Sequence, residues 1–70
     1  MSVTIENYTQ GNIYVELRWD KYSPHYYCFV GKEYSNGLVQ TIKNFSYNTI
    51  EKATRSFKRQ VAKVKKGEYE

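Results

Sequence analysis

The sequence predicts an α+β fold: a four-stranded antiparallel β-meander made of two hairpins, followed by one C-terminal α-helix packed on one sheet face (ββββα). Three observations predict it. The stretch IYVELRWD alternates strictly between apolar and polar residues, an Asn-Gly pair separates two further strand-like stretches, and apolar residues after position 49 recur at helical spacings. We expect one compact domain over residues 1–66 and a short acidic C-terminal tail over residues 67–70.

The first hairpin is expected to join strands over residues 2–8 and 12–20 through the turn signal TQGN, where Gly11 is free to adopt positive φ. The second of these strands has the period of two that is typical of a half-buried strand. One of its faces is apolar and the other polar: Ile13, Val15, Leu17 and Trp19 against Tyr14, Glu16, Arg18 and Asp20.

The second hairpin is expected to pair HYYCFVGKEY with LVQTIKNF around Asn36-Gly37, with Pro24 in the connection before it. Two registers are open. A two-residue loop pairs Val30 with Lys43, whereas a three-residue loop with Gly37 in the left-handed conformation pairs Val30 with Ile42 and Tyr34 with Leu38. We favour the second register because it gathers the more apolar face. That face holds Tyr26, Cys28, Val30, Tyr34, Leu38 and Ile42.

The last third of the chain is expected to be a helix. Ser46 and Asn48 are both candidate N-caps, because Asn48 with Glu51 forms a variant capping box and Ser46 would let Phe45 pack on Ile50. Gly67 suits the C-terminal cap. The core is expected to join residues of the sheet to the apolar stripe of the helix: Ile13, Val15, Leu17, Trp19, Val30 and Ile42 to Ile50, Ala53, Phe57, Val61 and Val64.

One helix covers one sheet face, so the other face is expected to stay uncovered. In the favoured register it carries Tyr14, Glu16, Arg18, Tyr27, Phe29, Val39 and Lys43, with Phe45 as a further candidate. Three interpretations remain open. The face is a homodimer interface, or it binds nucleic acid by stacking aromatic rings on bases, or the register differs, Phe29 is core and the tyrosines are ordinary strand residues.

The basic charge is concentrated in the expected helix. Residues 49–66 hold seven basic residues and one acidic residue, whereas residues 1–48 hold four of each. On a helical wheel one stripe lies opposite the apolar positions: Lys52, Arg55, Arg59, Lys63 and Lys66, flanked by Lys58 and Lys65. Exposed helix faces are commonly charged, but a purely solubilising face would mix signs because like charges repel. The stripe therefore predicts an anionic partner, with nucleic acid first and an acidic protein surface second.

Little in the sequence points to catalysis, a cofactor or a metal. His25 and Cys28 lie three residues apart on an expected strand and so point to opposite faces, and the sequence has no other His or Cys to complete a zinc site. The single cysteine fits a reducing compartment, and we find no signal peptide and no membrane-spanning run. We therefore expect a cytoplasmic protein that is not an enzyme and has no membrane partner.

The element order, the basic charge and the aromatic residues expected on the sheet are similar to DNA-binding modules such as the arm-binding domains of tyrosine recombinases. Those combine a three-stranded antiparallel sheet with a C-terminal helix. The resemblance covers residues 12–66 through no specific motif; it implies a DNA reader whose sheet enters the major groove, and no residue role is carried over.

The function expected is non-enzymatic DNA binding by phosphate neutralisation. The residues expected to contact DNA are Lys52, Arg55, Arg59, Lys63 and Lys66, with Arg18 and Lys43 as second contacts. The alternative is a protein-interaction or inhibitor module, of a phage or mobile element for example, that acts as a homodimer through Tyr14, Tyr27 and Phe29.

Overall fold

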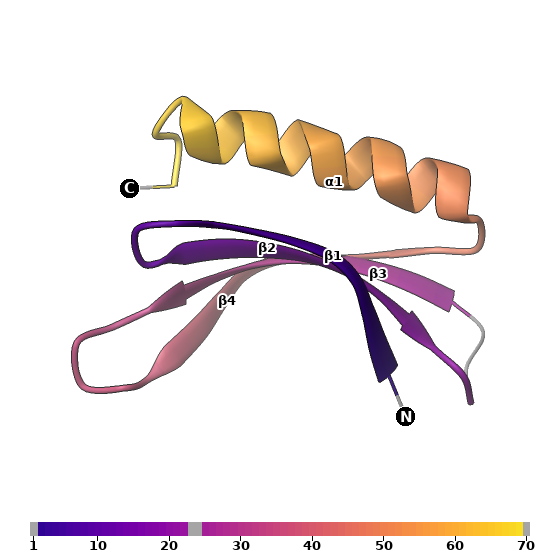
Figure 1. Ribbon diagram of the computed structural model, residues 1–70, viewed down its shortest axis with the longest axis horizontal. Coiled ribbons are helices and arrows are strands. Elements are labelled where there is room, and N and C mark those ends of the chain that lie inside the picture. The colour runs from indigo at the N-terminus through magenta and orange to yellow at the C-terminus, as the bar shows by residue number, and fades with distance from the viewer. Residues whose placement is uncertain (1, 23–24, 70) are drawn as a thin grey trace.

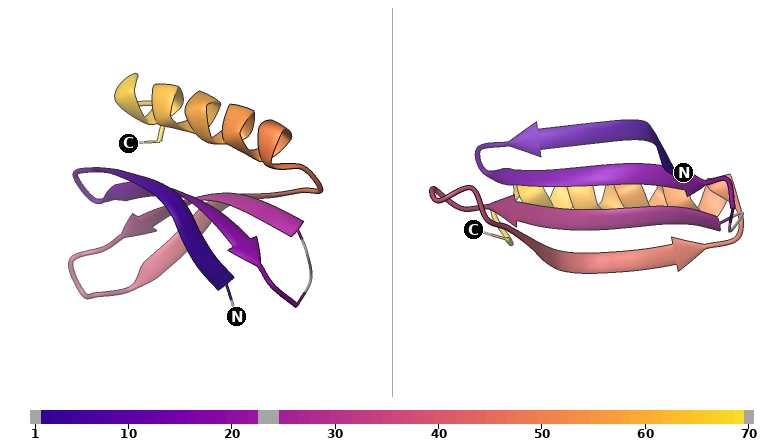
Figure 2. Two further views of the ribbon diagram at one scale, coloured as in Figure 1. Left: turned by 45° about the vertical axis from the view of Figure 1, so that its right-hand side comes forward. Right: turned by 90° about the horizontal axis from the view of Figure 1, so that it is seen from below.

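The computed structural model describes residues 2–22 and 25–69 and has the predicted ββββα architecture (Figure 1). Pro24 and its predicted connection lie outside the described residues. The strands are β1 (Ser2–Gln10), β2 (Ile13–Asp20), β3 (His25–Glu33) and β4 (Val39–Tyr47). They form one antiparallel sheet in sequence order, and α1 (Ile50–Lys65) runs along the middle of one face, over β2 and β3 (Figure 2).

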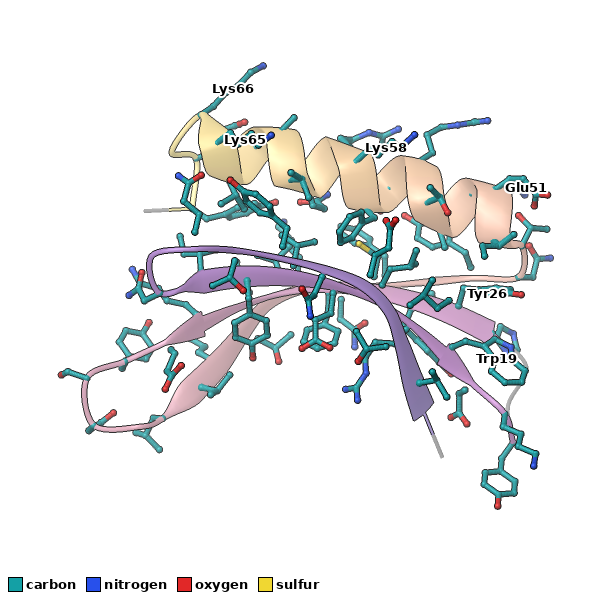
Figure 3. The ribbon with its side chains drawn as sticks, viewed as in Figure 1. Trp19, Tyr26, Glu51, Lys58, Lys65 and Lys66 are labelled. Carbon is teal, nitrogen blue, oxygen red and sulfur yellow. The ribbon has the colours of Figure 1, made fainter. Side chains whose placement is uncertain are left out.

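The core lies between this sheet face and α1. In β2 the predicted alternation is confirmed, because Ile13, Val15 and Leu17 are no more than 2% exposed while Tyr14 and Glu16 between them are half-buried on the far side. Cys28 and Val30 of β3 and three helix residues complete the buried set: Ala53, Phe57 and Val64. Trp19, predicted in the core, is only half-buried and lies towards the end of the sheet (Figure 3).

The β3–β4 hairpin combines the two registers that the sequence left open. At the turn the three-residue register holds: the Tyr34 N–H donates to the Leu38 carbonyl at 2.8 Å, and Gly37 has a φ of +85°. An irregularity at Ile42 then shifts the pairing by one residue, so that Val30 pairs with Lys43. The favoured pairing of Val30 with Ile42 is therefore wrong.

The shift at Ile42 changes which face several residues occupy. Phe45 pairs with Cys28 and Lys43 with Val30, so both lie on the helix side of the sheet; their predicted place on the uncovered face is wrong. Tyr34 and Leu38, predicted on the buried face, are exposed at the hairpin tip. The other edge strand also has an irregularity, between Thr4 and Glu6 of β1, so each edge of the sheet carries one β-bulge.

The N-cap of the helix differs from both predicted residues, since it lies one residue after Asn48 and three after Ser46. Thr49, in extended conformation, is the N-cap, and its hydroxyl accepts a hydrogen bond from the Lys52 N–H at 3.3 Å, so the prediction of Ser46 or Asn48 is wrong. At the other end Gly67 has a φ of +80°, and its N–H and that of Glu68 donate to the carbonyls of Val64 and Lys63. This Schellman arrangement confirms Gly67 as the C-terminal cap.

α1 is rolled about its axis relative to the predicted apolar stripe. Ser56 and Gln60 are buried, while Ile50, predicted in the core, is 41% exposed and Val61 is half-buried. The buried Gln60 amide oxygen accepts a hydrogen bond from the Tyr69 hydroxyl, so its burial leaves no unpaired acceptor there. Tyr69 lies in the segment expected as an acidic tail, and its ring packs against the core.

Candidate nucleic-acid interface

Six exposed cations form a row along the outer side of α1, which we call the basic ridge: Lys52, Arg55, Lys58, Arg59, Lys65 and Lys66. Figure 3 shows Lys58 and Lys66 on the side of the helix that faces away from the sheet. Their two ends are fourteen residues apart, so the ridge is roughly 21 Å long at 1.5 Å per residue. The fold thus presents the row as a straight, rigid series of positive charges.

Because α1 is rolled about its axis, the basic residues on its exposed side differ from the predicted stripe at the margins. Lys52, Arg55, Arg59 and Lys66 are exposed as the helical wheel predicts, whereas Lys63 is half-buried on the flank beside Ser56 and Gln60. Lys58, expected as a flanking residue, lies near the centre of the exposed side.

No carboxylate among the described residues forms an ion pair with a ridge cation. An ion pair on the sheet joins Arg18 to Glu16. Lys65 has an aromatic contact, with its Nζ 5.4 Å from the ring centroid of Tyr8. Glu51, in the first helical turn, is the acidic residue nearest to the ridge in sequence. Repulsion within the ridge is therefore relieved by solvent ions, or by an anionic partner.

The two predicted second contacts do not join the ridge. Arg18 lies on the opposite face of the sheet, where its Nε is 3.6 Å from a Glu16 carboxylate oxygen and its guanidinium is 5.8 Å from the Phe29 ring centroid. Lys43 lies on the helix side but on the outer strand β4. The structure therefore separates the predicted DNA-contacting residues into four ridge residues, Lys63 on the flank of the helix, Arg18 on the sheet and Lys43 on the edge strand.

The uncovered side of the sheet, which we call the open face, carries the predicted Tyr14, Tyr27 and Phe29 on neighbouring strands. Tyr14 and Phe29 meet edge to face, with ring centroids 5.9 Å apart and planes at 87°. The Tyr14 ring lies over Gly31, where a Cβ would come within 2.5 Å of its Cζ and hydroxyl. Burial, together with the charges of Glu16 and Glu33, raises the pKa of Tyr14 above its ordinary value.

One end of the open face is hollowed. The depression is lined by β1, β2 and the turn end of the second hairpin: Asn7, Thr9, Asn12, Tyr14, Glu16, Glu33 and Val39 among others. Its two carboxylates make it a poor phosphate site. The charge at this end of the open face is therefore negative, whereas the charge of the basic ridge, on the other side of the molecule, is positive.

Sequence reasoning missed the apolar tip of the second hairpin. Leu38 is 64% exposed and Val39 54% exposed, and Tyr34 is exposed beside them, with its hydroxyl donating to the Gln40 amide oxygen. The signal was present as apolar residues on both sides of Asn36-Gly37, but the favoured register assigned Tyr34 and Leu38 to the buried face.

Several kinds of site have no counterpart in the described part of the chain. Over residues 2–22 and 25–69, no group of three or more His, Cys, Asp or Glu residues is arranged to hold a metal ion. Within the same residues, α1 is neither long nor apolar enough to cross a membrane. Comparison with protein-family models, with curated proteins and with solved structures found no match.

Proposed function

We propose that this protein binds nucleic acid, without catalysing a reaction, by placing the basic ridge against the phosphates of a duplex. The observation that carries the proposal is the row of six exposed cations that no carboxylate in the described residues neutralises. A duplex is the polyanion that releases the most counterions to such a row, and that release supplies most of the binding free energy.

The composition of the ridge argues for phosphate contact with little reading of the bases. Asn and Gln are the side chains that pair with adenine edges, and the exposed side of α1 has neither, since Gln60 is buried; base reading by the ridge would be limited to guanine contacts from its arginines and lysines. Arg55 and Arg59 are one helical turn apart, and each guanidinium can donate two hydrogen bonds to one phosphate. We therefore expect binding that depends weakly on sequence and strongly on salt.

The open face is the weaker candidate for a phosphate contact. It has one arginine, which is already engaged by Glu16 and Phe29, and it has the carboxylates of Glu16 and Glu33. Two negative charges beside one occupied positive charge would repel a nucleic-acid backbone. The resemblance to the arm-binding domains of recombinases implies that the sheet contacts DNA. In this protein the open face of the sheet has a less suitable charge for that contact than the basic ridge.

The test is a titration of fluorescently labelled duplex DNA, followed by anisotropy, at salt concentrations from about 50 to 200 mM. If all six ridge cations meet phosphates, the slope of log affinity against log salt is about −5, which is roughly a thousandfold loss over that range. Arg55→Glu is expected to weaken binding tenfold or more and to reduce the slope by about 1.

The matched control is Lys21→Glu, which makes the same change in net charge at an exposed turn away from the helix. It is expected to change affinity by less than about threefold at 200 mM salt, where distant charges are screened. If Lys21→Glu weakens binding as much as Arg55→Glu does, binding depends on total charge and the ridge is not the site. Absence of binding at 50 mM salt would overturn the proposal.

A further inference from the structure

Cross-strand pairing arranges the central open-face residues in four rows. Between β2 and β3 the pairs are Arg18 with Tyr27, Glu16 with Phe29, and Tyr14 with Gly31. The fourth row is fixed by a hydrogen bond from the Glu33 N–H to the Asn12 carbonyl at 2.8 Å. Over these four rows the charge changes from Arg18, beside the aromatic residues, to Glu33, and the row beyond Arg18 pairs Asp20 with His25.

The two ends also differ in shape. At the first end Arg18 lies over the Phe29 ring, and Tyr27 stands beside them. At the other end Gly31 has no side chain, the end of the Tyr14 ring lies above it, and Glu33 and Val39 line the hollow. Bulky side chains beside Arg18 and a hollow beside Glu33 are complementary when a second copy is reversed.

We propose that the open face binds the open face of a second copy of this chain, about a two-fold axis that runs across the strands between the Phe29 row and the Gly31 row. Such an axis exchanges the first row with the fourth and the second with the third. Because this axis keeps each strand opposite its own copy, Arg18 of each copy faces the fourth row of the other, with Glu33 one strand to the side and within reach of its long side chain. Phe29 faces Gly31, beside Tyr14.

In the single chain the two groups that would pair in this dimer differ in how they are engaged. Arg18 forms an ion pair with Glu16 at 3.6 Å, although its buried Nε has no hydrogen-bond partner among the described residues. The Glu33 carboxylate forms no ion pair among those residues. Since Glu16 accepts a hydrogen bond from Thr4 at 3.3 Å, Glu33 is the carboxylate of the open face that remains free to receive Arg18 of the second copy.

The size of the open face sets the expected strength of the dimer. The molecule extends 33 Å along its longest axis and 15 Å along its shortest, which is the viewing direction of Figure 1 and runs across the strands, as the right-hand view of Figure 2 shows. A footprint on that scale is smaller than the roughly 800 Å² per partner of a standard interface. We therefore expect a reversible dimer with a dissociation constant in the range of about 10 to 100 µM.

In this dimer the two basic ridges point in opposite directions, because each helix lies on the outer side of its own sheet (Figure 2). One straight duplex cannot reach both ridges, so each dimer would join two separate nucleic-acid segments. This consequence rests on the proposed function, whereas the dimer itself does not.

Sedimentation equilibrium without nucleic acid tests the dimer, over protein concentrations from about 5 to 500 µM. Arg18→Glu and Glu33→Arg are each expected to weaken self-association tenfold or more, because each places like charges together at two symmetry-related contacts. An equal mixture of the two variants restores both contacts with opposite charges. Heterodimers with the affinity of the native dimer are therefore expected in the mixture.

Lys43→Glu is the matched control, since it reverses a charge on the helix side of an edge strand and should leave self-association unchanged. Circular dichroism at each concentration checks that every variant is folded. A native protein that stays monomeric at 500 µM overturns the dimer. A native dimer whose mixed variants fail to associate overturns the two-fold arrangement.

Bridging is tested separately with a biotinylated duplex on beads and a fluorescent duplex in solution, each of about 24 base pairs. The native protein is expected to capture the fluorescent duplex. Arg18→Glu, which leaves the ridge intact, is expected to bind the immobilised duplex and to capture at least fivefold less of the second. Equal capture by the two proteins would overturn bridging through the open face, even where the proposed function holds.

Discussion

The strand β2 supplies residues to two surfaces that differ in almost every respect. Ile13, Val15 and Leu17 face α1 and are no more than 2% exposed, whereas Tyr14, Glu16 and Arg18, which alternate with them, are half-buried on the open face. The covered side is held by packing against the helix. The open side is held by contacts among its own residues: Tyr14 with Phe29, and Arg18 with Phe29 and Glu16.

This difference separates the residues that keep the chain folded from those available to a partner. A chain of this length has a small core, so nearly all of its stability comes from the covered side. The open-face side chains are ordered by one another and do not depend on the helix. Substitutions there are expected to change recognition more than folding, and substitutions on the covered side the reverse.

The largest effect is expected from Leu17→Ala on the covered side. Removing this buried side chain leaves a cavity under α1 and is expected to cost about 2–5 kcal/mol, which is comparable to the whole stability of a domain of this size. Tyr27→Ala on the open face is the comparison, with an expected cost of about 1 kcal/mol or less. Urea unfolding, followed by the fluorescence of Trp19, measures both; similar losses would contradict the division between the two sides.

A smaller effect is expected from Gly31→Ala, which tests the packing of the open face itself. The new methyl group must displace the Tyr14 ring, whose Cζ and hydroxyl lie 2.5 Å from its position, at an expected cost of about 1–3 kcal/mol. In a Tyr14→Ala background the same change should be close to neutral, because the ring that it meets is gone. A double-mutant cycle with no coupling between the two sites would show that Tyr14 does not lie over Gly31.

A test of α1, the helix that covers the sheet, uses its N-cap residue. Thr49→Ala removes the hydroxyl that accepts from the Lys52 N–H and is expected to cost about 1 kcal/mol. Asn48→Ala is the matched control, with an expected change within about 0.5 kcal/mol. Thermal unfolding of both variants shows which residue is the N-cap. A larger loss of stability from Asn48→Ala than from Thr49→Ala would show that Asn48 is the N-cap, as the sequence predicted.

The smallest effects are expected at alkaline pH, and they differ between the two sides. Burial raises the pKa of the Cys28 thiol above its ordinary 9.0, although a hydrogen bond with Ser56 lowers it in part. Because the folded chain holds this proton more tightly than the unfolded chain, stability is kept below pH 9.0 and falls as pH rises above it, by at most about 1.4 kcal/mol per pH unit.

Burial likewise raises the pKa of Tyr14 above its ordinary 10.0. The stability that this group contributes is therefore lost as pH rises above 10.0. Cys28→Ala should therefore flatten the loss of stability just above pH 9, whereas Tyr14→Phe should flatten it only above about pH 10. Urea midpoints between pH 8 and 11 separate the two variants. A larger effect of Tyr14→Phe than of Cys28→Ala near pH 9 would contradict this assignment, because the loss that arises from a tyrosine with a raised pKa begins only near its ordinary 10.0.

The parts of the fold that sequence predicted are those that local pattern determines. The alternation in β2, the Asn-Gly turn and the Gly67 cap each depend on residues close together in the chain, and each is present as expected. The excess of positive charge on the outer side of α1 follows in the same way from helical spacing.

The errors arose where distant residues decide the outcome. The shift at Ile42 lets a three-residue turn and the Cys28–Phe45 pairing coexist, and no local pattern indicates a bulge there. The roll of α1 depends on Tyr69, which reaches back to Gln60 from beyond the helix. Without that partner a buried glutamine would be unfavourable, so the sequence pattern placed Ile50 and Val61 in the core instead.

The two β-bulges, at Ile5 in β1 and at Ile42 in β4, have a consequence for the fate of the protein at high concentration. A chain with eight tyrosines and a long outer strand is of the kind that grows into cross-β fibrils by adding strands to a free edge. Each bulge interrupts the ladder of hydrogen-bonding groups that such growth would copy. We therefore expect little growth by strand addition when the protein is concentrated.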